Sequence, residues 1–327
     1  MIVRLVAITV AVVALALVPY AISETYYVNI ASQILLYAVF ALGLNVLVGY
    51  AGLVSLGHAG LFGVAAYAVA YLLAAGFSQT FAIVAAIVIA LVATAGFAAL
   101  ALRATGISYI MITLALGEII WGLAYRWISI TNGDNGINVA ARPAPFGLSL
   151  SSATGFYEAT LIVFLLAIAA VAIFVRSPFG AALAGTRDQP RRMSALGYHV
   201  WMIRFGASMF SGLLTAAAGI LFVYYTLFIS PQALALTASA EGLLMVISGG
   251  AGTLLGPVVG AALVVIVKNV VSAYIVRWNF MLGAIFVAIV VLMPEGLVPG
   301  AVRLTRAAWR STGGRKSVAS PVAEPKP

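Results

Sequence analysis

Two carboxylates in this chain lie where an apolar environment leaves them few partners. Glu118 and Glu241 each fall near the middle of a long apolar run, and Asn45 does so in an earlier one. An ionisable group within a membrane span usually faces a bundle interior or a water-filled cavity. These residues therefore indicate either structural bonding between helices or the lining of a translocation pathway.

A further pair of polar side chains, Ser55 and His58, interrupts a glycine-dense segment, AGLVSLGHAGLFGVAAY, at residues 51–67. Irregular backbone persists at membrane depth only where it is buried in protein or lines water. Ser55 and His58 are therefore pathway candidates, and the alternative for His58 is a hydrogen-bonded packing role.

The second glycine-dense segment, ISGGAGTLLGPVVGAAL, occupies residues 247–263. After a break at Gly249 and Gly250, Gly252, Gly256 and Gly260 recur at every fourth residue. Lipid gives helices no hydrophobic reason to associate, so small-residue ridges supply close van der Waals contact instead. We expect these three glycines to share one packing face of a helix.

The sequence shows no catalytic apparatus. Its lysines are Lys268, Lys316 and Lys326, and none of them ends a P-loop of the form Gly-x-x-x-x-Gly-Lys-Ser/Thr. It has no cysteine, and its two histidines are far apart, which argues against a structural zinc site. We predict that the chain is not an enzyme and carries no cofactor. If its activity is driven by ATP, then ATP and Mg²⁺ are bound by partner subunits.

A charged segment at residues 176–204, RSPFGAALAGTRDQPRRMSALGYHVWMIR, separates two apolar stretches. Each arginine would cost about 2.5 to 3.5 kcal/mol at a bilayer centre, so the segment lies outside the hydrocarbon. A short helix is predicted within it, with Asp188 as N-cap, Pro190 in the first turn and Gly197 at its end. Such a helix between spans is a contact point for a partner.

The composition assigns these segments to a polytopic membrane protein. Hydrophobic residues make up 64% of the chain and charged residues 8%, with mean hydropathy +1.15; a soluble domain has about 25% charged residues. Runs of about 20 apolar residues mark membrane helices. We expect ten spans, near 5–22, 30–49, 57–76, 81–102, 107–127, 159–175, 205–228, 232–250, 254–276 and 279–297.

The distribution of basic residues sets the orientation. With the N-terminus inside, the inner segments contain most of them: Arg4, Arg103, Arg176, Arg187, Arg191, Arg192, Arg204, Arg303, Arg306, Arg310, Arg315 and Lys316. The outer side keeps Arg126, Arg142 and Arg277, as positive-inside topology predicts. The formal charge of +9 is explained in this way, and no motif for nucleic acid accompanies it. The opening residues also resemble a signal peptide, whose removal would place the mature N-terminus outside.

Ten spans divide into two halves of five, and because five is odd, a related second half would be inverted. This is the arrangement of inverted-repeat transporters. The alternative is ten spans without duplication. We therefore predict an all-α fold with a single transmembrane domain over 1–300, an inner loop at 177–203 and a basic tail at 301–327, partly disordered.

The longest outer segment, 128–158, combines an Asn-Gly-Asp-Asn-Gly turn cluster with Pro143 and Pro145. These residues disfavour a regular helix. The segment is either a solvated loop or a docking surface for a protein that delivers substrate from outside.

Four motifs in the same order resemble one family. They are GLNVLVGYAGLVSLGHAGLFGVAAY, YIMITLALGEIIWGLAYRWISITNGDNGI, GTRDQPRRMSALGYHVWMIRFGASMFSGLLTAAAGILF and SAEGLLMVISGGAGTLLGPVVGAAL. Together they resemble the permease subunits of branched-chain amino acid ABC importers, of the LivM type, over about residues 30–298.

The resemblance implies a type II importer fold in the cell inner membrane with both termini cytoplasmic. It implies four partners besides the bilayer: a second homologous permease, two cytoplasmic ATPase subunits and a periplasmic substrate-binding protein. It also implies that the inner loop couples to the ATPases through Arg187, Asp188, Arg191, Arg192, Ala195, Leu196 and Gly197. Pro190 stands where the family often has Glu or another helix former, and proline is tolerated in a first helical turn.

Several alternatives stay open at this point. Within the importer family, urea, short amides and aromatic acids are other cargoes beside branched-chain amino acids. An ion-coupled secondary transporter would use Glu118 or Glu241 to carry protons. A channel would conduct without partners, and a membrane-embedded transferase would need a catalytic cluster that the sequence lacks.

Overall fold

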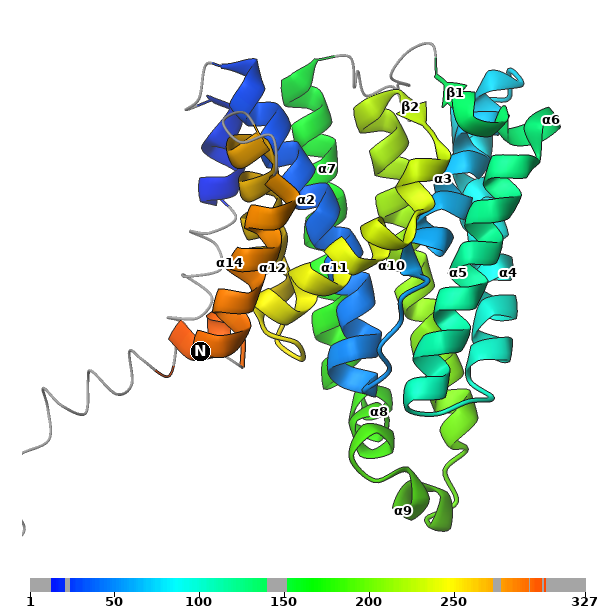
Figure 1. Ribbon diagram of the computed structural model, residues 1–327, viewed down its shortest axis with the longest axis vertical. Helices are drawn as coiled ribbons and strands as arrows, with labels where there is room; N and C mark the ends of the chain where they lie inside the picture. Colours follow the sequence, from blue (N-terminus) through cyan, green and yellow to red (C-terminus); the bar gives the residue numbers. More distant parts are fainter. Residues whose placement is uncertain are drawn as a thin grey trace, which may run out of the picture.

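The chain folds into a bundle of helices with a smaller helical element projecting from one end (Figure 1). The computed structural model describes residues 13–20, 24–139, 152–272, 278–293, 295–301 and 303. The main helices are α2 (Thr25–Asn45), α3 (His58–Ala74), α4 (Gln79–Ala101), α5 (Ile107–Arg126), α7 (Ala153–Arg176), α10 (Val200–Thr226), α11 (Leu236–Gly249), α12 (Gly256–Ile266) and α14 (Trp278–Leu292).

The shorter elements lie between these helices. They are the π-helical turns η1 (Val46–Ala51) and η5 (Val267–Val271), the helices α6 (Ile128–Thr131), α8 (Pro178–Asp188) and α9 (Pro190–Ala195), the 3-10 turns η2 (Gly133–Asn135) and η4 (Pro231–Leu234), and the strands β1 (Ile137–Asn138) and β2 (Phe228–Ile229).

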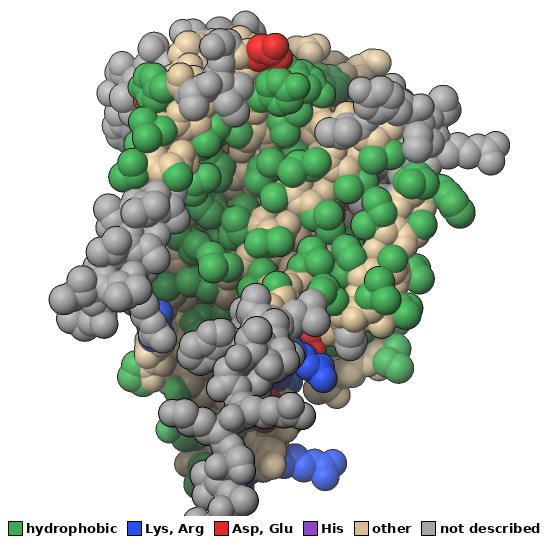
Figure 2. Space-filling view, turned by 90° about the vertical axis from the view of Figure 1, so that its left-hand side faces the viewer, with side chains coloured by type: hydrophobic (Ala, Val, Ile, Leu, Met, Phe, Trp, Pro, Cys, Tyr) green, Lys and Arg blue, Asp and Glu red, His purple; other side chains and the backbone are tan. Residues whose placement is uncertain are grey.

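The predicted class, a helical polytopic membrane protein, is confirmed. Five described helices are long and apolar enough to cross a membrane: Thr25–Ala51, Gln79–Ala101, Ile107–Arg126, Ala153–Arg176 and Val200–Thr226. Figure 2 shows one side of the molecule, where hydrophobic side chains cover the middle and the Lys and Arg side chains in view lie in the lower half. Such a surface suits lipid as its solvent.

Three of the predicted spans contain shorter helices than expected. The apolar helices His58–Ala74, Leu236–Gly249 and Gly256–Asn269 have between 10 and 17 residues, fewer than the roughly 20 that span a bilayer. The prediction for 232–250 was wrong at its start, because residues 231–234 form a 3-10 turn and the α-helix begins at Leu236. Of the first span, 5–22, the structure describes residues 13–20, which are helical.

Two parts of the chain share an order of elements: a long helix, a break and a shorter helix. We call the end of the bundle from which α8 and α9 project the inner end, and the opposite end the outer end (Figure 1). In the first part, α2 and η1 run to the inner end, Gly52 adopts φ +69°, and non-helical backbone leads back to α3. In the second, α10 runs to the outer end, Leu227 adopts φ +55°, and β2 and η4 lead to α11. The two units run in opposite directions in Figure 1. The inverted repeat itself stays a prediction.

Helices α2 and α10 form the centre of the bundle. The most apolar stretch of Thr25–Ala51 is 78% buried and that of Val200–Thr226 is 67% buried, whereas the corresponding values for α4, α5 and α7 lie between 22% and 28%. The peripheral helices α4, α5 and α7 therefore keep most of their apolar surface for lipid or for another protein. Because the central helices are almost surrounded by protein, their polar groups must find partners within it.

Small residues allow the peripheral helices to approach this centre. The buried face of α4 has Ala82, Ala86, Ala90, Thr94 and Ala98 at every fourth position, and α4 packs against α3 and α10. On α10, a β-carbon at Gly219 would overlap the backbone carbonyl of Phe62. Backbones that meet so closely gain van der Waals contact without a hydrophobic driving force.

A short antiparallel strand pair closes the outer end. Ile137 of β1 pairs with Ile229 of β2, and Asn138 pairs with Phe228. Nearby, the Gln232 amide donates to the Asp134 carboxylate at 3.1 Å. The segment after α5 is thus fastened to the connection between α10 and α11, and the sequence did not predict this pairing. The predicted proline-rich part of this segment lies outside the described residues.

The contact between α10 and α3 is testable with two glycine substitutions. Gly219→Ala places a methyl group on the Phe62 carbonyl, whereas Gly96→Ala, inside α4, meets nothing within 4 Å. Both changes bring the same gain in helix propensity of about 1 kcal/mol, so their difference measures the contact. We expect a lower thermal unfolding midpoint for Gly219→Ala than for Gly96→Ala in purified protein. Equal midpoints would contradict this packing.

Candidate functional site

The two glycine-dense segments meet at the inner end of α2. Asn45, which is fully buried, accepts a hydrogen bond from the Gly252 amide at 2.9 Å and donates one to the Thr253 carbonyl at 2.9 Å. A β-carbon at Gly49 would overlap the Gly252 amide nitrogen, so the two backbones touch. Asn45 therefore satisfies two partly buried backbone groups of the turn between α11 and α12.

The inner loop joins the same point through Arg187. Its Nη1 donates to the Gly49 carbonyl at 2.8 Å. Carbonyls in the last turn of a helix have no partner within the helix, and a guanidinium is a strong donor to one of them. We call the contacts among Asn45, Gly49, Arg187, Gly252 and Thr253 the inner junction.

The aliphatic part of the Arg187 side chain packs against Gly52, the residue after η1. A β-carbon at Gly52 would lie 2.6 Å from Arg187 Cγ. The head of Arg187 also donates from Nε to Asp188 Oδ1 at 2.8 Å, and both side chains are well exposed. The Arg187 side chain therefore contacts protein on one side and is exposed on the other.

Helices α8 and α9 form the element that projects at the lower end of Figure 1. The Ser177 hydroxyl caps α8 by accepting from the Gly180 amide at 3.2 Å. Arg204, in the first turns of α10, donates to the Thr186 carbonyl at 2.8 Å and so fixes the end of α8. The predicted N-cap was wrong: Asp188 is the last residue of α8, and Gln189 precedes α9 without a side-chain cap.

The predicted coupling residues after Asp188 are all on the surface of this element. Pro190 starts α9 as its first residue, and no residue of α9 is buried. Gly197 ends the helix with φ +88°. The exposed residues of this group are Arg191, Arg192, Ala195, Leu196 and Gly197. A partner at the inner face would meet them first, whereas Arg187 connects the element to the bundle.

His58 and Ser55 are buried inside the bundle, at the start of α3. Ser211 Oγ donates to the Gly43 carbonyl at 2.6 Å, so its oxygen accepts from His58 Nε2 at 2.9 Å. A neutral histidine with a proton on Nε2 accepts at Nδ1, where Ser55 Oγ lies at 3.3 Å. The network connects α3 to α2 and α10, as expected for a packing role of His58. The pathway role of Ser55 and His58 stays a prediction.

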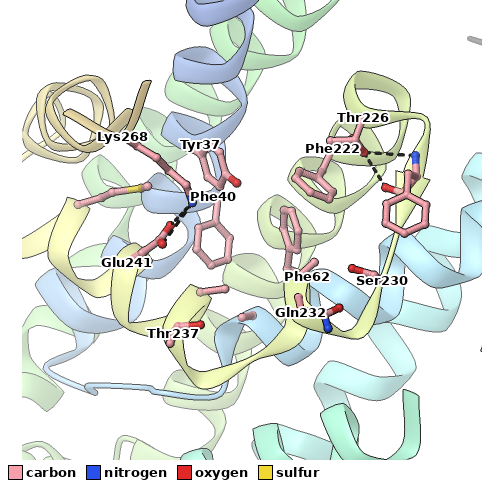
Figure 3. A pocket seen from close by; sticks show the side chains of 16 residues that line it. Tyr37, Phe40, Phe62, Phe222, Thr226, Ser230, Gln232, Thr237, Glu241 and Lys268 are labelled. Atoms are coloured by element: carbon pink, nitrogen blue, oxygen red, sulfur yellow. Dashed lines mark hydrogen bonds and ion pairs between the residues drawn. The ribbon is translucent and has the colours of Figure 1, made fainter. Parts of the chain in front are cut away.

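Glu241 faces a cavity of about 310 Å³ near the outer end (Figure 3). The Lys268 ammonium donates to both of its carboxylate oxygens, at 3.1 and 3.2 Å. Three phenylalanines, Phe40, Phe62 and Phe222, line the same cavity. We call this cavity the outer pocket; of the predicted pathway residues, it contains Glu241.

Glu118 is exposed on α5, and it makes no hydrogen bond or ion pair with any residue that the structure describes. Ala115 is exposed on the same helix, and Gly122 has open space where a β-carbon would be. A carboxylate that faced lipid in the middle of a helix would be costly. This face of α5 is therefore suited to protein rather than lipid.

The predicted packing glycines are divided between a turn and a helix. Gly256 begins α12, and Gly260 lies one turn later, where a β-carbon would overlap the Met245 carbonyl of α11. Gly252 was expected on the same helix face but lies before the helix, with φ +78°. It contacts Gly49 instead.

Sequence reasoning missed three contacts of the candidate sites. The bond from Arg187 to Gly49 joins residues 138 positions apart, and no local pattern marks it. Ser211 resembles an ordinary small residue of an apolar helix. For Lys268, the presence of a lysine and a glutamate in neighbouring spans was the available signal, and the structure pairs them.

Comparisons with known proteins agree on one family. The family model described as branched-chain amino acid transport system / permease component matches residues 26–290. The high-affinity branched-chain amino acid transport system permease protein LivM of Salmonella typhimurium is 28% identical, and that of Escherichia coli is 29% identical. Each match covers 83% of this chain and 70% of the relative. No solved structure matches.

The contact between Gly52 and Arg187 is testable with a matched control. Gly52→Ala and Gly76→Ala both place an alanine at a positive φ, +69° and +83°, but nothing lies within 4 Å of a β-carbon at Gly76. We expect Gly52→Ala to lower the thermal unfolding midpoint further, by the equivalent of about 1 to 3 kcal/mol for overpacking.

Removing the arginine stem should relieve that additional loss. In the Arg187→Ala background, Gly52→Ala should lower the thermal unfolding midpoint only as much as Gly76→Ala does. A double-mutant cycle between positions 52 and 187 measures this coupling. An additive result, with no coupling between positions 52 and 187, would refute the contact.

Proposed function

The chain belongs to the permease family of branched-chain amino acid transport systems, and on this premise we propose that it is the membrane subunit of an ATP-driven importer. The proposed cargo is a branched-chain or related hydrophobic amino acid. The proposed location is the cell inner membrane, with both termini cytoplasmic. Urea, short amides and aromatic acids are the cargoes to compare.

The observation that carries the proposal is the attachment of the projecting element to the bundle. The exposed helix α9 offers Arg191 and Arg192 to a partner at the inner face, and Arg187 joins the neighbouring helix α8 to Gly49. A force applied to α9 therefore has a direct mechanical route to the inner junction, where both glycine-dense segments meet.

The energy source is proposed to lie in two cytoplasmic ATPase subunits, which bind ATP and Mg²⁺. The sequence of this chain has no P-loop, so it would act as the driven part. ATP binding closes the ATPases, and their closure shifts the α8–α9 element. A shift of this kind biases a two-state permease only if the partners bind the two states with different affinity.

One feature supports a conduit that is completed by a second permease. The exposed Glu118 face of α5 requires a protein neighbour or water at membrane depth. A homologous permease on that face would be the protein neighbour, and a pathway between the two chains would bring water to Glu118. Most selectivity would then come from a periplasmic binding protein that docks at the outer end, near the β1–β2 pair.

Reconstituted uptake tests this proposal. The permease, its second permease and two ATPases are placed in liposomes with the binding protein and labelled leucine. In molecules whose inner face points into the liposome, we expect uptake to require ATP in the lumen. We also expect uptake to persist when a protonophore collapses the proton gradient. Uptake that follows the proton gradient without ATP would instead establish the ion-coupled class.

The role of α9 is testable by charge reversal. Arg191→Glu with Arg192→Glu should lower the uptake per ATP hydrolysed by about tenfold or more, since like charges at an interface cost several kcal/mol. The control pair Arg103→Glu with Arg176→Glu makes the same charge change at other exposed inner positions. If the α9 variant forms an intact complex with a normal ratio of uptake to ATP hydrolysis, α9 is not part of the ATPase interface.

A further inference from the structure

The outer pocket has a charged wall and an apolar wall. Figure 3 shows Glu241 and Lys268 on one side, and Phe222 and Thr226 on the other. Phe62 stacks edge to face with Phe40 and with Phe222, at ring-centroid distances of 5.3 Å in both cases. At about 310 Å³, the cavity is at the lower end of the range of about 300 to 1,000 Å³ usual for ligand sites. It is therefore suited to a small solute.

The charged wall has one negative and one positive side chain. Glu241 and Lys268 are bonded to each other at 3.1 Å, and their side chains are 21% and 35% exposed, so both are within reach of the cavity. A free α-amino acid has one ammonium and one carboxylate separated by a single carbon. It can therefore offer an ammonium to Glu241 and a carboxylate to Lys268 at the same time.

We propose that the outer pocket binds an apolar α-amino acid whose two charged groups insert between Glu241 and Lys268, with its side chain against Phe40, Phe62 and Phe222. This inference rests on the proposed function and adds to it a site within the permease itself. The exchange of one ion pair for two leaves every charge with a counter-charge, which a buried site requires.

The same argument gives the specificity. An amine without a carboxylate, or an acid without an amine, would leave one unbalanced charge in the pocket, so both should be rejected. Ser230 and Gln232 also line the cavity and add polar groups to it. The phenylalanine wall favours a branched or aromatic side chain over a polar one.

The binding test uses the complete transporter in lipid nanodiscs, without nucleotide and without binding protein. Labelled L-leucine is the probe, and the competitors are isopentylamine, which lacks the carboxylate, and 4-methylpentanoate, which lacks the amine. We expect saturable leucine binding and at least about tenfold weaker competition by either analogue, since truncating one partner of a charge pair exceeds the tenfold threshold of 1.4 kcal/mol. No leucine binding, or equal competition by one analogue, would overturn the proposal.

Charge variants test the two residues. Glu241→Gln and Lys268→Met should each weaken leucine binding at least about tenfold. The double variant Glu241→Gln/Lys268→Met leaves neither charge unpaired, so it should fold and still fail to bind. The control variants Glu24→Gln and Arg126→Met alter exposed charges outside the pocket and should bind as the unmodified protein does. Normal leucine binding by the double variant would refute the site.

A cavity-filling variant separates binding from folding. Ala238 lines the pocket, and Ala238→Leu reduces its space while keeping the ion pair. We expect leucine binding to fall while alanine binding is retained. Loss of neither ligand, or of both equally in a folded complex, would contradict the placement of the side chain in this cavity.

The outcome of this test is distinguishable from that of the proposed function. If uptake in the same preparation requires ATP and the pair variants bind leucine normally, the pocket is refuted and the importer stands. If leucine binding depends on Glu241 and Lys268 but uptake does not require ATP, the pocket stands and the importer is refuted.

Discussion

The absence of water at membrane depth is the constraint on which this structure depends. Wherever the chain breaks its helices, backbone donors and acceptors need partners within the protein. Asn45 supplies them for Gly252 and Thr253, and Arg187 supplies one for Gly49. The breaks in the two glycine-dense segments are stable because they share one set of bonds, and the inner loop is part of that set.

On the proposed function, the two ends of the bundle have different tasks. At the inner end, the contacts are backbone bonds and close glycine packing, which transmit displacement because packed elements shift as units rather than deform. Toward the outer end, a cavity carries an ion pair and a wall of phenylalanines, which suits recognition of a solute. The buried network of His58, Ser55 and Ser211 lies between them as a fixed support.

Local signals in the sequence predicted the class, most helix positions and the projecting inner element, because apolar runs and clustered arginines report directly on lipid and water. They did not predict how the breaks are closed. Asn45 stood out as a polar residue in a span, yet its partners lie more than 200 positions away. Gly252 takes part in the same long-range contacts, and no periodicity marks its place before α12.

The bonds of the inner junction require the inner loop and the turn between α11 and α12 to move together. The chain has no cysteine, so spin labels at Gln189→Cys and Leu255→Cys, both exposed, allow their distance to be measured in the complete transporter with and without ATP. We expect an unchanged distance between these two labels, and a changed distance between Gln189→Cys and an outer label at Gln232→Cys. A shift between positions 189 and 255 on ATP binding, with none between 189 and 232, would contradict it.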